Sequence, residues 1–243
     1  MTDVCEICGL QVSRGDLLDH VQAVTGRARQ GQGGWLLTLN TEMLARGSRD
    51  PGYLGLIRQA DIITADGMPL VWASKFKYPA NPVAGRTTGV DLVDAILRLE
   101  EVPAFAVIGG VSPQETIARY GASAMQACRF VFDGRVDLSE KQLAWFCEEL
   151  VRSEVRVAFI ALGVPKQDQL ALELRARLPF LVVTGIGGTF EILGPDGARA
   201  PMWMQRVGLE WLFRLLKEPG RLWRRYILNY PRGIALLLKD CFR

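Results

Sequence analysis

Short apolar runs alternate with segments of helical spacing along most of this chain, and that order limits its fold more than any other feature. The runs that read as buried strands are Trp35–Leu39, Asp61–Thr64, Ala104–Ile108, Phe130–Phe132, Val155–Leu162 and Phe180–Thr184. The segments between them with helical periodicity are Gly89–Leu99, Pro113–Ala127, Ser139–Val151 and Gln167–Leu178. Strands and helices in alternation predict an α/β fold, with a mainly parallel sheet and helices on both faces.

Small and polar residues follow several of these predicted strands. Asn40, Gly109, Gly163 and the Gly187-Gly188 pair all lie at or just after the end of an apolar run. In open parallel sheets a ligand binds outside the carboxyl ends of the strands, and glycine there lets the backbone approach it closely. We therefore expect the binding site at this edge of the sheet, although the last glycine turn resembles a dinucleotide-binding fingerprint only loosely.

The end of the chain differs in charge from the rest. Residues 199–243 contain ten Lys or Arg and three Asp or Glu, whereas the whole chain has a net charge of only +3. The strand and helix alternation stops there as well, and Pro201 can open a helix that Pro219 should end. The sequence therefore predicts a catalytic core over 1–197 and a basic helical appendage over 198–243.

The predicted appendage has the pattern of a helix that lies at a membrane surface. Trp203, Val207, Trp211 and Leu215 fall on one stripe, and basic residues make another. Lys and Arg beside Trp and Leu suit the interface of an anionic bilayer, although a solvated helix face is the alternative. Nucleic acid is a less suitable partner, because the core is net acidic and contains no nucleic-acid-binding motif.

Several classes of protein are disfavoured by the composition. The five cysteines are scattered and odd in number, which argues against a disulfide framework. Cys5 and Cys8 have no second pair and read as part of a strand or turn, and His20 is the single histidine. A zinc site and a Ser-His-Asp or Cys-His enzyme are therefore unexpected. With no signal-peptide pattern and no apolar run near the ~18 residues that span a bilayer, we expect a cytoplasmic protein with no transmembrane helix. No cofactor is expected either.

Three loops after predicted strands contain candidate catalytic or binding side chains. Asp66 can act as a general base at the end of its strand, or it can simply cap the following helix. The loop with Arg86 and Thr87 either binds a phosphate or is an ordinary capped loop. Lys166 and Gln167 suit contacts to a nucleotide or a sugar, and a capped helix start is again the alternative.

Six segments together resemble the WecG/TagA/CpsF family of bacterial glycosyltransferases. They occur in the family's order over roughly residues 34–230, and the set is highly specific although each segment alone is weak. The segments are 38–42 (TLNTE), 65–69 (ADGMP), 85–89 (GRTTG), 163–167 (GVPKQ), 185–190 (GIGGTF) and the tail pieces 199–201 (RAP), 208–214 (GLEWLFR) and 218–226 (EPGRLWRRY). Asp168 follows the fourth segment where the family usually has Glu.

The resemblance implies a Rossmann-like core and an appendage that reaches the membrane and helps to close the active site. It implies an inverting, metal-independent transfer of a sugar from a nucleotide donor, typically UDP-linked. The acceptor would be a sugar on a polyprenyl diphosphate at the inner face of the membrane, in cell-surface polysaccharide synthesis. The chain contains no Asp-x-Asp, the pair with which many nucleotide-sugar enzymes hold a metal, so Arg, Lys and helix N-termini would meet the diphosphate charge.

Roles for single residues follow from the resemblance by position. Asp66 would deprotonate the acceptor hydroxyl, with Thr38 and Asn40 beside it in the pocket. Arg86 and Gln167 would contact the donor or the acceptor. The arginines that would stabilise the departing diphosphate are Arg214, Arg221 and Arg224. The remaining candidates for substrate binding are Thr87, Gly109, Gly163, Lys166, Gly187 and Gly188.

Other functions stay open on the sequence alone. A nucleotide-dependent oxidoreductase on a Rossmann-like fold is one, and a non-catalytic scaffold recruited to the membrane is another. Within the glycosyltransferase reading, the donor sugar can be N-acetylmannosamine, its uronic acid or a hexose such as glucose or galactose. The resemblance also allows a homo-oligomer, formed through surfaces that the appendage would otherwise cover.

Overall fold

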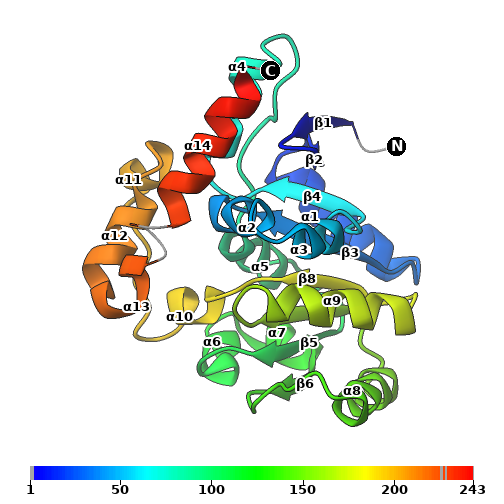
Figure 1. Ribbon diagram of the computed structural model, residues 1–243. Helices are drawn as coiled ribbons and strands as arrows, with labels where there is room; N and C mark the ends of the chain where they lie inside the picture. Colours follow the sequence, from blue (N-terminus) through cyan, green and yellow to red (C-terminus); the bar gives the residue numbers. More distant parts are fainter. Residues whose placement is uncertain (1–2, 225–226, 228, 243) are drawn as a thin grey trace.

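The computed structural model of the chain contains a six-stranded parallel sheet (Figure 1). It describes residues 3–224, 227 and 229–242, without the side chains of Arg206, Arg221 and Arg224. From edge to edge the strands are β4 (Ile62–Ala65), β3 (Gly34–Leu39), β8 (Val182–Gly185), β7 (Val157–Ala161), β5 (Phe105–Gly109) and β6 (Cys128–Phe132). All neighbouring pairs are parallel, so the predicted α/β fold and its six strands are confirmed.

Helices cover both faces of this sheet, as predicted. Successive side chains of a strand point to opposite faces, and in β3 Trp35 and Leu37 join one apolar core while Leu36 joins the other. The helices on the first face are α2 (Thr41–Gly47), α3 (Pro51–Ile57), α8 (Glu140–Arg152) and α9 (Lys166–Arg177). Those on the second face are α1 (Leu17–Arg29), α5 (Gly89–Leu97), α6 (Pro113–Ala118), α7 (Ala122–Ala127) and α10 (Thr189–Leu193).

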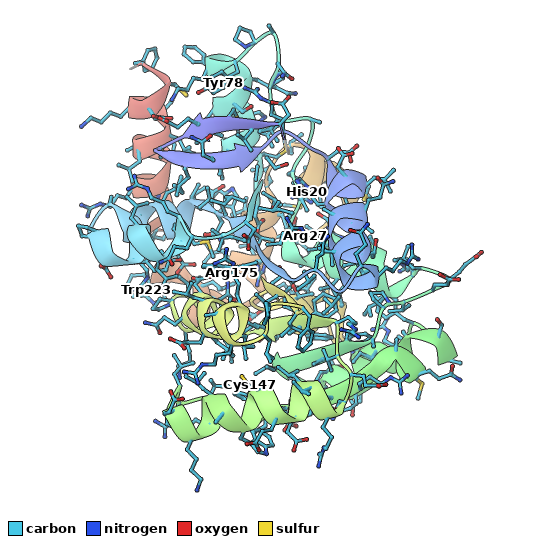
Figure 2. The ribbon with its side chains drawn as sticks, turned by 90° about the vertical axis from the view of Figure 1, so that its right-hand side faces the viewer. His20, Arg27, Tyr78, Cys147, Arg175 and Trp223 are labelled. Atoms are coloured by element: carbon cyan, nitrogen blue, oxygen red, sulfur yellow. The ribbon has the colours of Figure 1, made fainter. Side chains whose placement is uncertain are left out.

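An antiparallel hairpin at the N-terminus completes the first core. It consists of β1 (Val4–Ile7) and β2 (Leu10–Ser13), and it packs against β4 and α4 (Met68–Lys77). Cys5 is buried in the hairpin and Cys8 lies in its turn, which confirms the strand-or-turn interpretation of this segment. Tyr78, beside the hairpin in Figure 2, donates a hydrogen bond to the carbonyl oxygen of Glu6 at 3.0 Å.

Glycine breaks two of the predicted helices. The segment Pro113–Ala127 was expected to be helical throughout, but Gly121, with φ of +89°, separates α6 from α7. The helix expected after Pro201 is likewise divided, because Gly208 has φ of +72°. An L side chain rarely adopts such angles, so both turns depend on glycine.

The basic tail forms four described helices: α11 (Met202–Arg206), α12 (Glu210–Lys217), α13 (Pro219–Arg224) and α14 (Tyr230–Cys241). As predicted, the first amphipathic stretch ends before Pro219. α14 then returns to pack on α2 and α4 (Figure 1). A Cβ on Gly233 would lie only 2.7 Å from the Cβ of Thr41, so α14 is very close to the start of α2. The division of the chain at residue 197 stays a prediction, since Leu237 of α14 belongs to the first core.

Candidate functional site

A cavity of about 360 Å³ opens at the carboxyl ends of β3, β4, β7 and β8, the edge at which the sequence predicts a site. Its lining includes nine of the predicted site residues: Thr38, Asn40, Asp66, Arg86, Gly163, Gln167, Gly187, Gly188 and Arg214. The tail contributes further lining residues, which are Gly208, Glu210, Trp211 and Tyr230. The cavity is therefore shared between the strand ends and the appendage.

Asp66 is placed at the cavity wall by the turn between β4 and α4. Its N–H donates a hydrogen bond to the carbonyl oxygen of Leu39 at 2.7 Å, which ties the turn to the end of β3. Gly67, with φ of +124°, is the cap residue of α4, and no side chain caps that helix by a hydrogen bond. The alternative interpretation of Asp66 as the cap residue of this helix is therefore wrong, and Asp66 is one of the residues that line the cavity.

The two polar residues at the end of β3 are held by the strand ends and by α2. The hydroxyl of Thr38 donates to the carbonyl oxygen of Gly185 at 3.2 Å. Asn40 Oδ1 accepts a hydrogen bond from the N–H of Met43 at 3.1 Å and so caps α2. Both side chains are fixed before any ligand binds.

Gln167 braces the glycine turn after β8. Its Oε1 accepts a hydrogen bond from the N–H of Gly187 at 3.1 Å, and its side chain is almost fully buried. A Cβ on Gly185 would lie 2.7 Å from Gln167 Nε2, so a side chain at this position would displace the Gln167 amide. Arg214 reaches the same turn, because its Nη2 lies 3.4 Å from the point where a Gly188 side chain would begin.

Asp66 and the Gly188 turn stand two strands apart in the sheet. β8 is separated from β4 by β3 alone, and a spacing of ~4.8 Å per strand puts the two strand ends about 10 Å apart. Groups held at two strand ends with this spacing can act on opposite sides of one sugar ring. Trp211 and Tyr230 add a pair of rings, 5.6 Å between centroids and 29° from parallel, at the same cavity.

Arg86 joins the core to the appendage in a group of four charges. Its guanidinium forms an ion pair with Glu210 at 2.9 Å and lies 3.7 Å from Asp91. It also donates to Gln205 Oε1 at 3.2 Å. Arg199 forms a second ion pair with Asp91. Since the side chains of Arg86, Asp91 and Glu210 are only 15–17% exposed, water screens this network weakly.

Three predicted binding residues lie outside the cavity lining. Thr87 is buried, and its hydroxyl bonds Nδ1 of His20 on α1 at 2.9 Å. Gly109 packs against Ala161 with φ of +87°. The Lys166 ammonium donates to the carbonyl oxygen of Val136 at 2.7 Å. These residues position loops and do not face the cavity.

Burial lowers the pKa of His20, whose Nε2 also bonds the Ser13 hydroxyl at 2.9 Å. The backbone N–H of Thr87 donates to the carbonyl oxygen of Ala65 at 2.9 Å, so His20 and Thr87 together fix the loop that carries Arg86 next to Asp66. The side chains of Arg221 and Arg224, two further predicted site residues, lie outside the part of the chain that the structure describes.

Asp168, the neighbour of Gln167, forms a buried polar pair with Tyr53. The Tyr53 hydroxyl donates to Asp168 Oδ2 at 2.7 Å, and Oδ1 makes no hydrogen bond to the described residues. Burial raises the pKa of Asp168 to about 6, although the hydrogen bond from Tyr53 opposes this. Because the pair links α3 to α9, it supports the helix that carries Gln167 into the cavity.

Several lining residues were not among the predicted site residues, and they include Glu191, Glu210, Trp211 and Tyr230. Glu210 and Trp211 lie in the tail segment used for the family resemblance, so a signal for them was present. Tyr230 had none, because its place depends on how α14 packs on α2, whereas Glu191 directly follows the glycine segment 185–190. Within the described residues, no three His, Cys, Asp or Glu side chains come together as metal ligands.

The chain matches the model of the Glycosyl transferase WecG/TagA/CpsF family over residues 5–243. It is also similar to the N-acetylglucosaminyldiphosphoundecaprenol N-acetyl-beta-D-mannosaminyltransferase of Bacillus spizizenii. The two are 28% identical over 221 residues, which cover 86% of this chain and 80% of that protein.

Proposed function

The chain belongs to the WecG/TagA/CpsF family of glycosyltransferases, and on that basis we propose that it moves N-acetylmannosamine from a UDP-sugar to a polyprenyl-diphosphate-linked N-acetylglucosamine. The observation that carries the proposal is the shared cavity, in which Asp66 follows β4 and Arg214 of α12 lies beside the turn after β8. The name of the Bacillus relative supports the choice of sugar and acceptor. The uronic acid of N-acetylmannosamine and the hexoses remain the competing donors, because such specificity depends on a few pocket contacts.

In the proposed reaction Asp66 takes the proton of the acceptor hydroxyl. The hydroxyl oxygen then forms a bond to the anomeric carbon of the donor sugar from the side opposite the diphosphate, which inverts that carbon. The bond between this carbon and the diphosphate oxygen breaks, and UDP leaves with the bonding electrons. Arg214, with Arg221 and Arg224 as further candidates, stabilises the charge on the leaving group.

Each wall of the cavity suits a part of this reaction. Arg214, beside the Gly188 turn, suits the diphosphate, since a guanidinium favours an anion. The rings of Trp211 and Tyr230 suit a flat apolar surface such as a nucleobase or a sugar face. No metal is needed in this scheme, because cationic side chains supply the positive charge.

The acceptor places the reaction at the inner face of the cytoplasmic membrane. We propose that the basic appendage holds the protein there as a peripheral membrane protein. Among the described helices, none is both long and apolar enough to cross a bilayer.

A turnover assay tests the proposal. UDP release is measured with a panel of UDP-sugars, a short-chain polyprenyl-diphosphate-linked N-acetylglucosamine and EDTA. We expect acceptor-dependent turnover that survives EDTA and falls ~10²- to 10⁴-fold in Asp66→Asn, the usual effect of losing a general base. Asp133→Asn is a matched control, since Asp133 also follows a strand, β6, but lies outside the cavity.

Each alternative outcome has a definite meaning. Normal turnover in Asp66→Asn would remove Asp66 from the role of base, and loss of turnover in EDTA would overturn the metal-independent scheme. Preference for another UDP-sugar would replace N-acetylmannosamine as the donor. If no sugar nucleotide supported turnover, the transferase proposal would fail.

A further inference from the structure

Large apolar side chains that are exposed to solvent are concentrated in α4 and the tail. Of sixteen such side chains in the described residues, ten belong to α4 or to the tail from Met202 onward. These two segments make up only about a fifth of the chain. The ten residues are Trp72, Phe76, Met202, Trp203, Val207, Leu216, Trp223, Ile227, Leu238 and Phe242. Exposed apolar clusters of this kind mark interaction surfaces.

The exposed rings of α4 connect the two ends of the appendage. Trp72 and Phe76 are one helical turn apart, so they project from the same face of α4. A Cβ on Gly208 would lie 3.1 Å from Cη2 of Trp72, which places the turn after α11 against this ring. At the other end the rings of Phe76 and Phe242 are 5.3 Å apart. The apolar surface is therefore continuous from α11 across α4 to the end of α14, as the neighbouring ribbons of α4 and α14 in Figure 1 suggest.

These rings remain largely in water although other contacts already fasten α14 to the core. Trp72 is 49% exposed, Phe76 59% and Phe242 77%. α14 is fastened instead by its Gly233 contact with α2 and by Asp240, which pairs with Lys77 at 3.0 Å and accepts a hydrogen bond from the N–H of Cys8 at 2.9 Å. The rings are thus available to a partner.

The exposed charges around the apolar surface are mostly positive. On α4 and the described tail, the exposed basic side chains are Lys75, Lys217, Arg232 and Lys239, whereas Glu218 is the exposed acid. A partner with anionic groups beside apolar material fits this combination, and a bilayer with anionic lipids has both. Tryptophan and phenylalanine rings suit the boundary between headgroups and acyl chains.

We propose that α4 of the core, together with α11 and α14, forms a face that docks on an anionic bilayer. The inference rests on the proposed function in one respect, that the acceptor is a lipid. It extends the docking surface from the appendage to a helix of the core. Because α4 begins two residues after Asp66, contact between α4 and the bilayer sets the proposed base beside the membrane that presents the acceptor.

The test compares binding of the full chain to vesicles of phosphatidylglycerol and phosphatidylcholine by co-sedimentation. Phe76→Ser and Phe242→Ser each remove an exposed ring from the proposed face. We expect each to weaken binding about tenfold, because burying such a side chain is worth ~1.5 kcal/mol or more. Leu18→Ser and Val151→Ser are matched controls on α1 and α8, where equally exposed apolar side chains lie outside the face. They should bind as the unchanged chain does.

Activity on a water-soluble short-chain acceptor separates this proposal from the proposed function. We expect Phe76→Ser and Phe242→Ser to keep that activity and their urea unfolding midpoint while losing vesicle binding. Equal vesicle binding by all four variants would overturn the docking face. A change in sedimentation coefficient without any change in vesicle binding would overturn it as well, because the surface would then bind a second copy of the chain. Absence of turnover in the unchanged chain would instead contradict the transferase proposal.

Discussion

Replacing Asp168 by Asn should stabilise the protein more at neutral pH than at acidic pH. In the folded chain, burial raises the pKa of this carboxyl from an ordinary value of 3.8 to about 6. The folded state therefore binds the proton more tightly than the unfolded state. It follows that the stability from this group is fully present below pH ~4 and is lost as the pH rises to ~6.

The size of the effect follows from the two pKa values. A difference of about 2 units, at 1.36 kcal/mol per unit, costs the folded state about 3 kcal/mol once the carboxyl is ionised. Part of that cost is already present near pH 4, so about 2 kcal/mol should appear between about pH 4 and pH 7.5. Asp168→Asn has the same shape, can still accept the Tyr53 hydrogen bond and carries no charge.

Urea denaturation of both proteins across this pH range measures the difference in their free energies of unfolding. Other carboxyl groups titrate equally in both and cancel, and Asp133→Asn controls for the loss of an exposed carboxylate. We expect the advantage of Asp168→Asn to grow by about 2 kcal/mol from acid to neutral pH. Tyr53→Phe should become less stable relative to the unchanged chain as the pH rises, because it removes the donor that stabilises the ionised carboxylate. If the difference in free energy of unfolding between Asp168→Asn and the unchanged chain stayed constant with pH, the reasoning would be refuted.

Two further predictions concern the appendage. Gly233→Ala should lower the free energy of unfolding by ~1–3 kcal/mol, because its new methyl group overlaps Thr41 and forces α14 away from α2. In the control Gly55→Ala, in α3, the new methyl group has no atom within 4 Å, so the free energy of unfolding should rise by ~0.5–1 kcal/mol. Urea denaturation that gave both variants the same change would contradict the packing argument. Glu210→Gln should lower kcat/KM by roughly tenfold, since the charge that holds Arg86 in the cavity is lost, and Glu210→Asp should restore part of it. Unchanged steady-state kinetics in Glu210→Gln would show that the ion pair does not position Arg86 for turnover.

The sequence predicted the strands and several residues of the cavity correctly where they depend on local sequence pattern. Apolar periodicity located all six strands of the sheet, and the parallel order predicts that their carboxyl ends meet at one edge. Thr38, Asn40 and Asp66 reach one cavity for that reason. The breaks at Gly121 and Gly208 were missed because helical spacing continues on both sides of each glycine, and only the backbone angle shows the turn.

Features that depend on long-range packing could not be predicted from the same patterns. Tyr230 lines the cavity because α14 turns back onto α2, and that approach depends on the fit of Gly233 against Thr41. Arg86 was predicted to contact substrate, but its ion pair with Glu210 was not predicted, because the two residues are far apart in the chain. Lys166 was predicted to bind substrate because it lies in a site motif. Its ammonium group instead donates to a backbone carbonyl outside the cavity lining.

The position of β8 affects how the protein folds as it is synthesised. β8 is the last strand of the sheet in the chain, yet it lies between β3 and β7. Until residues 182–185 leave the ribosome, the strand that joins β3 to β7 is missing, so any sheet formed by then would consist of two halves, β4 with β3 and β7 with β5 and β6, each with an open edge. Open edges readily pair with other chains. A chain released before β8 would therefore tend to aggregate, and it would have no cavity, because the cavity walls come from both halves.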